Sequence, residues 1–134
     1  MIKPDAVESG KWGKIIDHII AEDYKILGVK MQRMSEAEAR AFYAVHKERP
    51  FYEELVEFMS SGPSVLLVLE KADAVPAWRD TIGATDPAEA AAGTIRAKFA
   101  ENKGRNAVHG SDSDENAQKE IAFFFSEAEL ILNQ

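Results

Sequence analysis

The run Ser64-Val65-Leu66-Leu67-Val68-Leu69-Glu70 is the part of the sequence that decides the fold. It is short, leucine-rich and β-branched, and this pattern predicts a buried strand. Gly62 and Pro63 come directly before it and end a helical stretch. A second predicted strand covers residues 27–31, where apolar side chains alternate with Gly28 and Lys30. The chain is therefore expected to build its sheet from short strands set between helices.

Helical patterns surround both strands. Apolar residues recur at i, i+3, i+4, i+7 and i+8 over residues 12–20, and Ser35 with Glu38 forms a capping box for a helix from residue 36. The other predicted elements are a helix opened by Pro50 that runs to Met59, a helix at 74–81, a helical stretch opened by Asp86-Pro87, a helix at 94–99, a loop at 101–105, a short strand at 107–108, a helix at 117–125 and a last helix capped by Ser126 with Glu129. Helices outnumber strands and alternate with them, which predicts a two-layer α/β sandwich formed by residues 1–134 as one domain.

The composition excludes several classes of protein. The chain has 134 residues, 46% of them apolar and 29% charged, which is typical of a globular protein that folds around its own core. It has no cysteine, which excludes disulfides, cysteine-ligated metals and a thiol nucleophile. Its net charge of −7 argues against nucleic acid and anionic membranes as partners, and no apolar run is long enough to cross a bilayer. We expect a cytoplasmic protein in which any anion is held by a local basic cluster.

Three histidines are the main candidates for chemistry, because the sequence lacks a phosphate loop, a Gly-x-Gly-x-x-Gly motif and a His-Glu-x-x-His motif. His18 lies off the apolar stripe of its predicted helix and is expected to be exposed. His46 ends a predicted helix, where a structural role is the better expectation. His109 follows the predicted strand at 107–108 and precedes a glycine, which would present its ring to a cavity. On this local pattern a functional and a structural role for His109 are equally well supported.

A series of motifs then carries a resemblance to a known family. The segment Asn106-Ala107-Val108-His109-Gly110-Ser111-Asp112-Ser113 resembles the signature of nucleoside diphosphate kinases. The similarity extends over nearly the whole chain through further motifs at residues 2–7, 42–51, 61–63, 78–79, 83–87 and 93–96. Each motif is weak alone, but their order around a histidine makes the resemblance specific.

The resemblance implies a fold and a reaction. The fold would be a ferredoxin-like βαββαβ sandwich of the α+β kind with additional helices, its first strand shortened because only Met1 and Ile2 precede Lys3. The reaction would be a ping-pong exchange, in which a nucleoside triphosphate such as ATP or GTP phosphorylates His109 and a nucleoside diphosphate takes the phosphoryl group away. A neutral imidazole can act as the nucleophile without a separate base. Two alternatives stay open: a nucleotide-binding oligomer of weakened activity, and a relay that passes phosphate from the histidine to proteins.

The resemblance also assigns roles by position. Glu120 would orient the ring of His109, while Lys3 and Tyr43 would complete the catalytic group. The residues implied to bind the nucleotide are Lys3, Phe51, Arg79, Thr85, Arg96 and Asn106. Phe51 would stack on the base, and the cations would hold the phosphates. Mg²⁺ would be held mainly by those phosphates, with Asp112 as a candidate contact through water. The family forms hexamers or tetramers built from dimers, so a homo-oligomer is expected.

Overall fold

The computed structural model describes residues 1–131 and 133. Its elements are α1 (Pro4–Glu8), α2 (Trp12–Ala21), β1 (Lys25–Gln32), α3 (Glu36–Phe42), the short 3-10 helix η1 (Ala44–His46), α4 (Tyr52–Met59), β2 (Ser64–Glu70), α5 (Ala74–Ile82), α6 (Ile95–Phe99), α7 (Asp114–Phe124) and α8 (Glu127–Ile131). None of the described helices is both long and apolar enough to cross a membrane.

The sheet has a ferredoxin-like strand order. β1 and β2 pair antiparallel from Lys25 opposite Glu70 to Gln32 opposite Ser64. On the other side of β2, Ile2 forms a bridge with Val65 and a second bridge with Val108. The spatial order is therefore the segment at Val108, the segment at Ile2, β2 and β1. The predicted strand at 107–108 and the short first strand are each represented by a single bridged residue.

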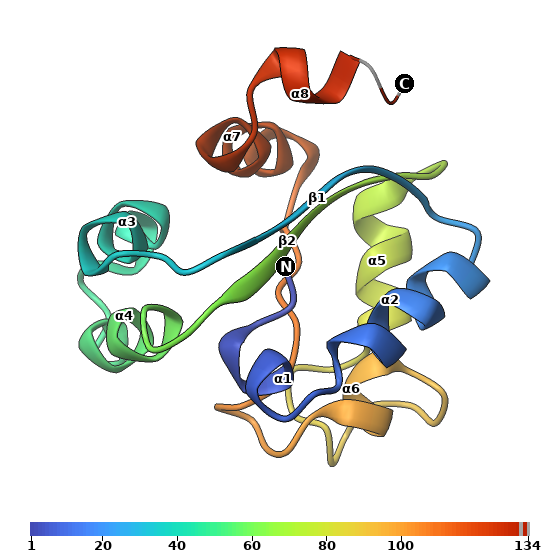
Figure 1. Cartoon of the computed structure of the whole chain (residues 1–134). Coiled ribbons are helices and arrows are strands. Elements are labelled where there is room, and N and C mark those ends of the chain that lie inside the picture. The colour runs from blue at the N-terminus through green and yellow to red at the C-terminus, as the bar shows by residue number, and fades with distance from the viewer. Residues whose placement is uncertain (132, 134) are drawn as a thin grey trace.

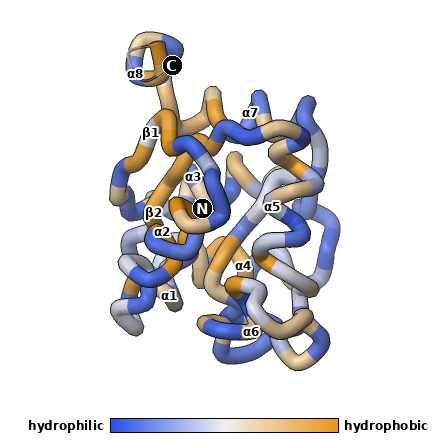
Figure 2. The backbone as a smooth tube through the Cα atoms, turned by 90° about the vertical axis from the view of Figure 1, so that its right-hand side faces the viewer, coloured by the Kyte–Doolittle hydropathy of each residue, from blue (hydrophilic) through white to orange (hydrophobic). Residues whose placement is uncertain are grey.

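Helices cover both faces of the sheet (Figure 1). Val65 and its neighbours on one face pack with Ile2, Ile15, Ile19 and the buried residues of α5 and α6. Leu66 and Val68 point the opposite way and pack with Leu27 and with Phe125 at the end of α7. This division follows from the two-residue period of a strand. The hydrophobic colouring of the trace accordingly gathers along β1 and β2 (Figure 2).

The helix pair α3–α4 has an apolar core of its own beyond the end of the strands (Figure 1). Met34, Ala39, Tyr43, Val56 and Met59 are buried there. The capping box predicted for α3 is confirmed: Ser35 Oγ accepts the Glu38 N–H at 3.1 Å, and Glu38 Oε1 accepts the Ser35 N–H at 2.9 Å. Pro50 does not open α4, which begins at Tyr52.

The helical stretch predicted from Asp86 is wrong. Asp86 Oδ1 accepts the Ala88 N–H at 3.0 Å, and successive i to i+3 bonds then replace helical ones. Gly93 closes this segment with φ of +87°. A local side-chain bond of this kind competes with helix formation, and it overrides the helix propensity of the alanines.

The predicted exposure of His18 is also wrong. Its side chain is 9% exposed because α6 packs across it, with Lys98 Nζ 2.9 Å from His18 Nδ1. The sequence also gave no indication of α1, which begins at Pro4 with proline in the first helical position.

Candidate active site

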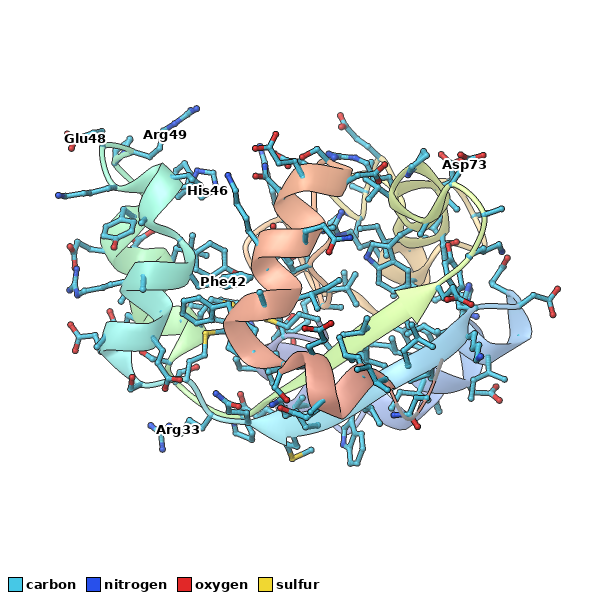
Figure 3. All side chains as sticks on the ribbon, turned by 90° about the horizontal axis from the view of Figure 1, so that it is seen from above. Arg33, Phe42, His46, Glu48, Arg49 and Asp73 are labelled. Carbon is cyan, nitrogen blue, oxygen red and sulfur yellow. The ribbon has the colours of Figure 1, made fainter. Side chains whose placement is uncertain are left out.

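One cavity of about 920 Å³ collects every residue to which the sequence assigns a role. Its lining includes Lys3, Tyr43, Phe51, Arg79, Thr85, Arg96, Asn106, His109, Asp112 and Glu120. These residues come from segments far apart in the sequence. The cavity lies where the α3–η1–α4 hairpin, the segments after α5 and before α7, and α7 itself meet. In Figure 3, Phe42 and His46 lie on the side of the hairpin that faces α7, whereas Glu48 and Arg49 point outward.

His109 is held by a carboxylate. Its Nε2 lies 2.5 Å from Glu120 Oε1, and the two side chains are 23% and 24% exposed. An ionised carboxylate can only accept, so Nε2 carries the hydrogen and Nδ1 keeps a lone pair. Nδ1 has no hydrogen-bond partner among residues 1–131 and 133. The structure thus leaves the ring nitrogen nearer the main chain available for reaction.

The surroundings of the ring favour its neutral form. Burial lowers the pKa of His109 below the usual 6.5 and outweighs the hydrogen bond that the ring donates to Glu120, which acts in the opposite direction. The rings of Phe42 and Tyr43 enclose it with edge contacts at centroid distances of 5.6 and 6.0 Å. At neutral pH the ring is therefore neutral, as a nitrogen nucleophile requires.

The backbone around His109 is fixed by Trp78. The indole N–H donates to the His109 carbonyl at 3.3 Å. The indole also lies against Gly110, where an added Cβ would stand 2.6 Å from Trp78 Cδ1. Glycine is therefore required at position 110 for close packing.

Lys3 and Asn106 form a polar pair in the lining of the cavity. Lys3 Nζ donates to Asn106 Oδ1 at 2.9 Å, and Asn106 Nδ2 donates to the Thr85 carbonyl at 3.2 Å. Burial, assisted by repulsion from Arg96, lowers the pKa of Lys3 to about 8, while Asp5 acts in the opposite direction. Lys3 is thus charged at neutral pH but close to losing its proton.

Arg96 is the buried cation of the site, at 8% exposure. It donates to three backbone carbonyls, those of Asn106 at 3.3 Å, Gly83 at 3.0 Å and Val108 at 2.9 Å. Three of its five N–H groups are used in this way, and no carboxylate of the described residues neutralises it. Arg79 and Thr85 are exposed at the same cavity. The local basic cluster expected in an acidic chain is therefore present.

The aromatic side of the cavity is formed by the α3–η1–α4 hairpin. Tyr43 is 6% exposed, and its hydroxyl is buried without a hydrogen-bond partner in the described part of the chain. Burial raises the pKa of this phenol, which keeps it a donor. His46 stacks on Tyr43 at 6.4 Å and contacts the ring of Phe51 at 5.6 Å. Phe51 is 44% exposed at the mouth of the cavity.

Sequence reasoning missed several residues of this site. The sequence predicts a structural role for His46, yet this residue lines the cavity, as do Phe42 and Lys119. Asp5 is 3% exposed and accepts the N–H of Ala107, a residue with φ of +72°. A non-glycine residue in this region costs about 1–3 kcal/mol. The only sequence signal for the role of Asp5 is its place as a charged residue in the motif at residues 2–7, directly before the apolar Ala6 and Val7.

The carboxylates do not form a metal cage. Among residues 1–131 and 133, no three histidine or acidic side chains lie together as ligands. Asp112 is exposed at the cavity, and a hydrogen bond from Asn116 lowers the pKa of its carboxyl. An ionised carboxylate at that position fits an ion that a bound polyphosphate would hold for the most part.

As a class, these features define a histidine-centred site for an anionic substrate on a ferredoxin-like sheet. The family model described as nucleoside diphosphate kinase matches residues 1–130. The nucleoside diphosphate kinase of Sulfurimonas denitrificans is 58% identical over 130 residues, which are 97% of this chain and 95% of that protein.

Solved structures agree with this match. The Aquifex aeolicus nucleoside diphosphate kinase superposes with a TM-score of 0.94 at 53% identity, covering 96% of this chain and 94% of the other. A Halobacterium salinarum nucleoside diphosphate kinase in complex with CDP superposes with a TM-score of 0.91 at 40% identity, covering 96% and 86%. The chain belongs to the nucleoside diphosphate kinase family. The predicted family and the ferredoxin-like fold are both confirmed.

Proposed function

We propose that this chain transfers the terminal phosphoryl group of a nucleoside triphosphate to a nucleoside diphosphate through a phosphohistidine at His109. The observation that carries the proposal is the 2.5 Å contact between His109 Nε2 and Glu120, which leaves Nδ1 free. In the first half-reaction Nδ1 attacks the terminal phosphorus, the bond from phosphorus to the bridging oxygen breaks, and the diphosphate leaves. In the second half-reaction another diphosphate attacks the phosphorus, and the P–N bond breaks.

Glu120 stabilises the charge that forms on the ring. When Nδ1 bonds to phosphorus, the imidazole becomes cationic, and the carboxylate at Nε2 interacts more strongly with it than with the neutral ring. Because Nε2 already carries the hydrogen, no proton has to move during the transfer.

The cations and donors of the cavity act on the phosphates. Arg96 has two N–H groups left for phosphate oxygens. The exposed guanidinium fork of Arg79 has no hydrogen-bond partner in the described part of the chain and could bind phosphate as well. The Tyr43 hydroxyl, buried without a partner in the described part of the chain, would gain one from a phosphoryl oxygen. Lys3 would add its charge beside the transferring group.

The remaining contacts hold the nucleoside. Asn106 and Lys3 would reach the ribose, Thr85 would add a hydroxyl donor at the phosphates, and Phe51 would stack on the base with its exposed face. Mg²⁺ would neutralise the phosphates when bound with the nucleotide, with Asp112 in reach through water. Phosphate binding and nucleoside binding both depend on side chains that line one continuous cavity.

We further propose that the chain acts as a homo-oligomer built from dimers. Ile20 of α2 and Val29 and Met31 of β1 are 58%, 54% and 48% exposed. Val29 and Met31 lie on β1, whose outer edge pairs with no strand of the described residues. Apolar side chains on an open sheet edge favour association between copies. Light scattering would distinguish the hexamer from the tetramer, and a monomer would contradict the proposal. A cytoplasmic location remains an expectation.

The test of the function is direct detection of the phosphoenzyme. ATP with magnesium and no acceptor should add one phosphate per chain, labile in acid and stable in alkali, and a diphosphate such as GDP should remove it. His109→Ala should abolish the adduct, while His18→Ala, outside the cavity, should keep it. A phosphate that survives acid or persists in the His109 variant would contradict the assignment. An adduct that passes only to proteins would favour a relay, and one that is not discharged would favour a weakened enzyme.

A further inference from the structure

The backbone directly before His109 has an unusual conformation. The Val108 N–H donates to the Asn106 carbonyl at 2.8 Å, which closes a three-residue turn around Ala107. The φ of Ala107 is +72°, and the residue is fully buried. A three-residue turn with positive φ at its centre is a rare and strained form of γ-turn. Such a conformation persists only where neighbouring groups hold it.

Asp5 is one of the groups that hold this turn. Its Oδ2 accepts the Ala107 N–H at 2.9 Å, and the Lys3 N–H donates to the Ala107 carbonyl at 2.8 Å. Arg96 binds the carbonyls on either side, at Asn106 and Val108. Both main-chain groups of Ala107 are thus tied to one short segment that contains Lys3 and Asp5.

The chemistry of Asp5 suggests more than a role in stability. It is 3% exposed, and its Oδ1 is buried without a hydrogen-bond partner in the described part of the chain. A buried carboxylate with an unpaired oxygen is costly to keep. Glycine at position 107 would adopt the positive φ without strain, and the turn would then not require the buried carboxylate. The carboxylate also lies near Lys3, whose protonated form it favours.

We infer that Asp5 is a positioning residue for phosphoryl transfer: it holds the strained turn at Ala107 and so sets the direction of His109. Its charge also favours the protonated form of Lys3, against the larger effect of burial. The inference rests on the proposed function, since both effects act on groups assigned to the transfer. His109 lies two residues after Ala107, and its ring must meet both Glu120 and the phosphate. A small rotation of the turn would misdirect Nδ1.

The experiment compares the rate at which ATP phosphorylates His109 in single-turnover mixing. Asp5→Ala should slow this rate by on the order of tenfold to a hundredfold, with a smaller change in the concentration of ATP that gives half the maximal rate. Adding Ala107→Gly to Asp5→Ala should restore a large part of the rate, because glycine adopts positive φ without strain. Rescue by glycine is not expected if Asp5 only stabilises the fold.

Asp5→Asn separates the two effects. The amide can still accept the Ala107 N–H but has no charge, so the rate at pH 7 should exceed that of Asp5→Ala. The fall in rate at alkaline pH should move to lower pH because the pKa of Lys3 loses the support of Asp5. Glu8→Gln is the matched control: it removes a charge from the same helix, at an exposed residue that pairs with Arg105 at 3.6 Å, and should leave rate and profile unchanged.

The outcomes distinguish this inference from the proposed function. If the wild-type chain forms no phosphohistidine, the proposed function fails. If it does, and folded Asp5→Ala reacts as fast as the wild type, or glycine at 107 gives no rescue, the positioning role is wrong. Should Asp5→Ala not fold, an alkaline limb that does not move in Asp5→Asn would overturn the inference.

Discussion

The pKa of Lys3 leads to a prediction about the alkaline limb of the reaction. A lysine with a pKa of about 8 is roughly 90% charged at pH 7 and roughly 10% charged at pH 9. The lysine contributes while it is protonated, so its contribution is present below pH 8 and is lost as the pH rises through that value. If only the charged form supports transfer, kcat/KM should fall about tenfold between pH 7 and pH 9.

The assay is kcat/KM for GDP with a fixed triphosphate donor, measured from pH 6.5 to pH 9.5. The matched variant is Lys3→Arg, because arginine stays protonated throughout this range. Its absolute rate will change with the shape of the side chain, but its profile should stay flat between pH 7 and pH 9. A flat wild-type profile, or an equal fall in the arginine variant, would refute the reasoning. So would an NMR titration that places the Lys3 pKa near its usual value.

Three further predictions concern other parts of the cavity. Glu120→Gln should slow phosphorylation of His109 on the order of a hundredfold, since an amide stabilises the cationic ring less. Glu115→Gln, five residues earlier on α7, should have little effect. Equal rates for the wild type and Glu120→Gln in a stopped-flow mixing experiment would remove Glu120 from the mechanism. Gly110→Ala should lower both Tm and rate, because the added Cβ would overlap the indole of Trp78. The control Gly13→Ala should lower neither, since its added Cβ would have no atom within 4 Å. An unchanged Tm for Gly110→Ala would contradict the packing described for Trp78. Because Phe51 offers a flat ring and no hydrogen-bond code, kcat/KM for GDP, ADP and CDP should differ by less than about a thousandfold, roughly 4 kcal/mol, and a larger preference would show that base edges are recognised.

The elements that could be predicted from sequence are those with strong local signals. The strand predicted at residues 64–70 is confirmed as β2, because a buried apolar run of this length has few alternative structures. The capping box at Ser35 fixed the start of α3. The segment after Asp86 could not be predicted, because the choice between helix and turn depended on one side-chain bond. The burial of His18 depended on α6, which is distant in sequence.

The set of residues at the site was available from motifs, but their arrangement was not. All ten residues named for catalysis, nucleotide or metal contact line the same cavity, yet their individual roles, like the one-domain organisation, stay predictions. The turn at Ala107 had no signal, because alanine gives no indication of a left-handed backbone. Tertiary bonds from Asp5 and Arg96 impose it.

Arg96 illustrates why backbone geometry decides the electrostatics here. A carboxylate partner would have neutralised the guanidinium before any substrate arrived, whereas three carbonyl dipoles stabilise it and leave its net charge intact. The same three bonds connect the segments at Gly83, Asn106 and Val108, so this side chain also organises the wall of the cavity. Arg96→Ala should therefore lower stability as well as rate, because it leaves the carbonyls of Gly83 and Val108 without a donor among the described residues. Arg79 is exposed and has no such bonds in the described structure, so Arg79→Ala is the variant that isolates the contribution of a cation to phosphate binding.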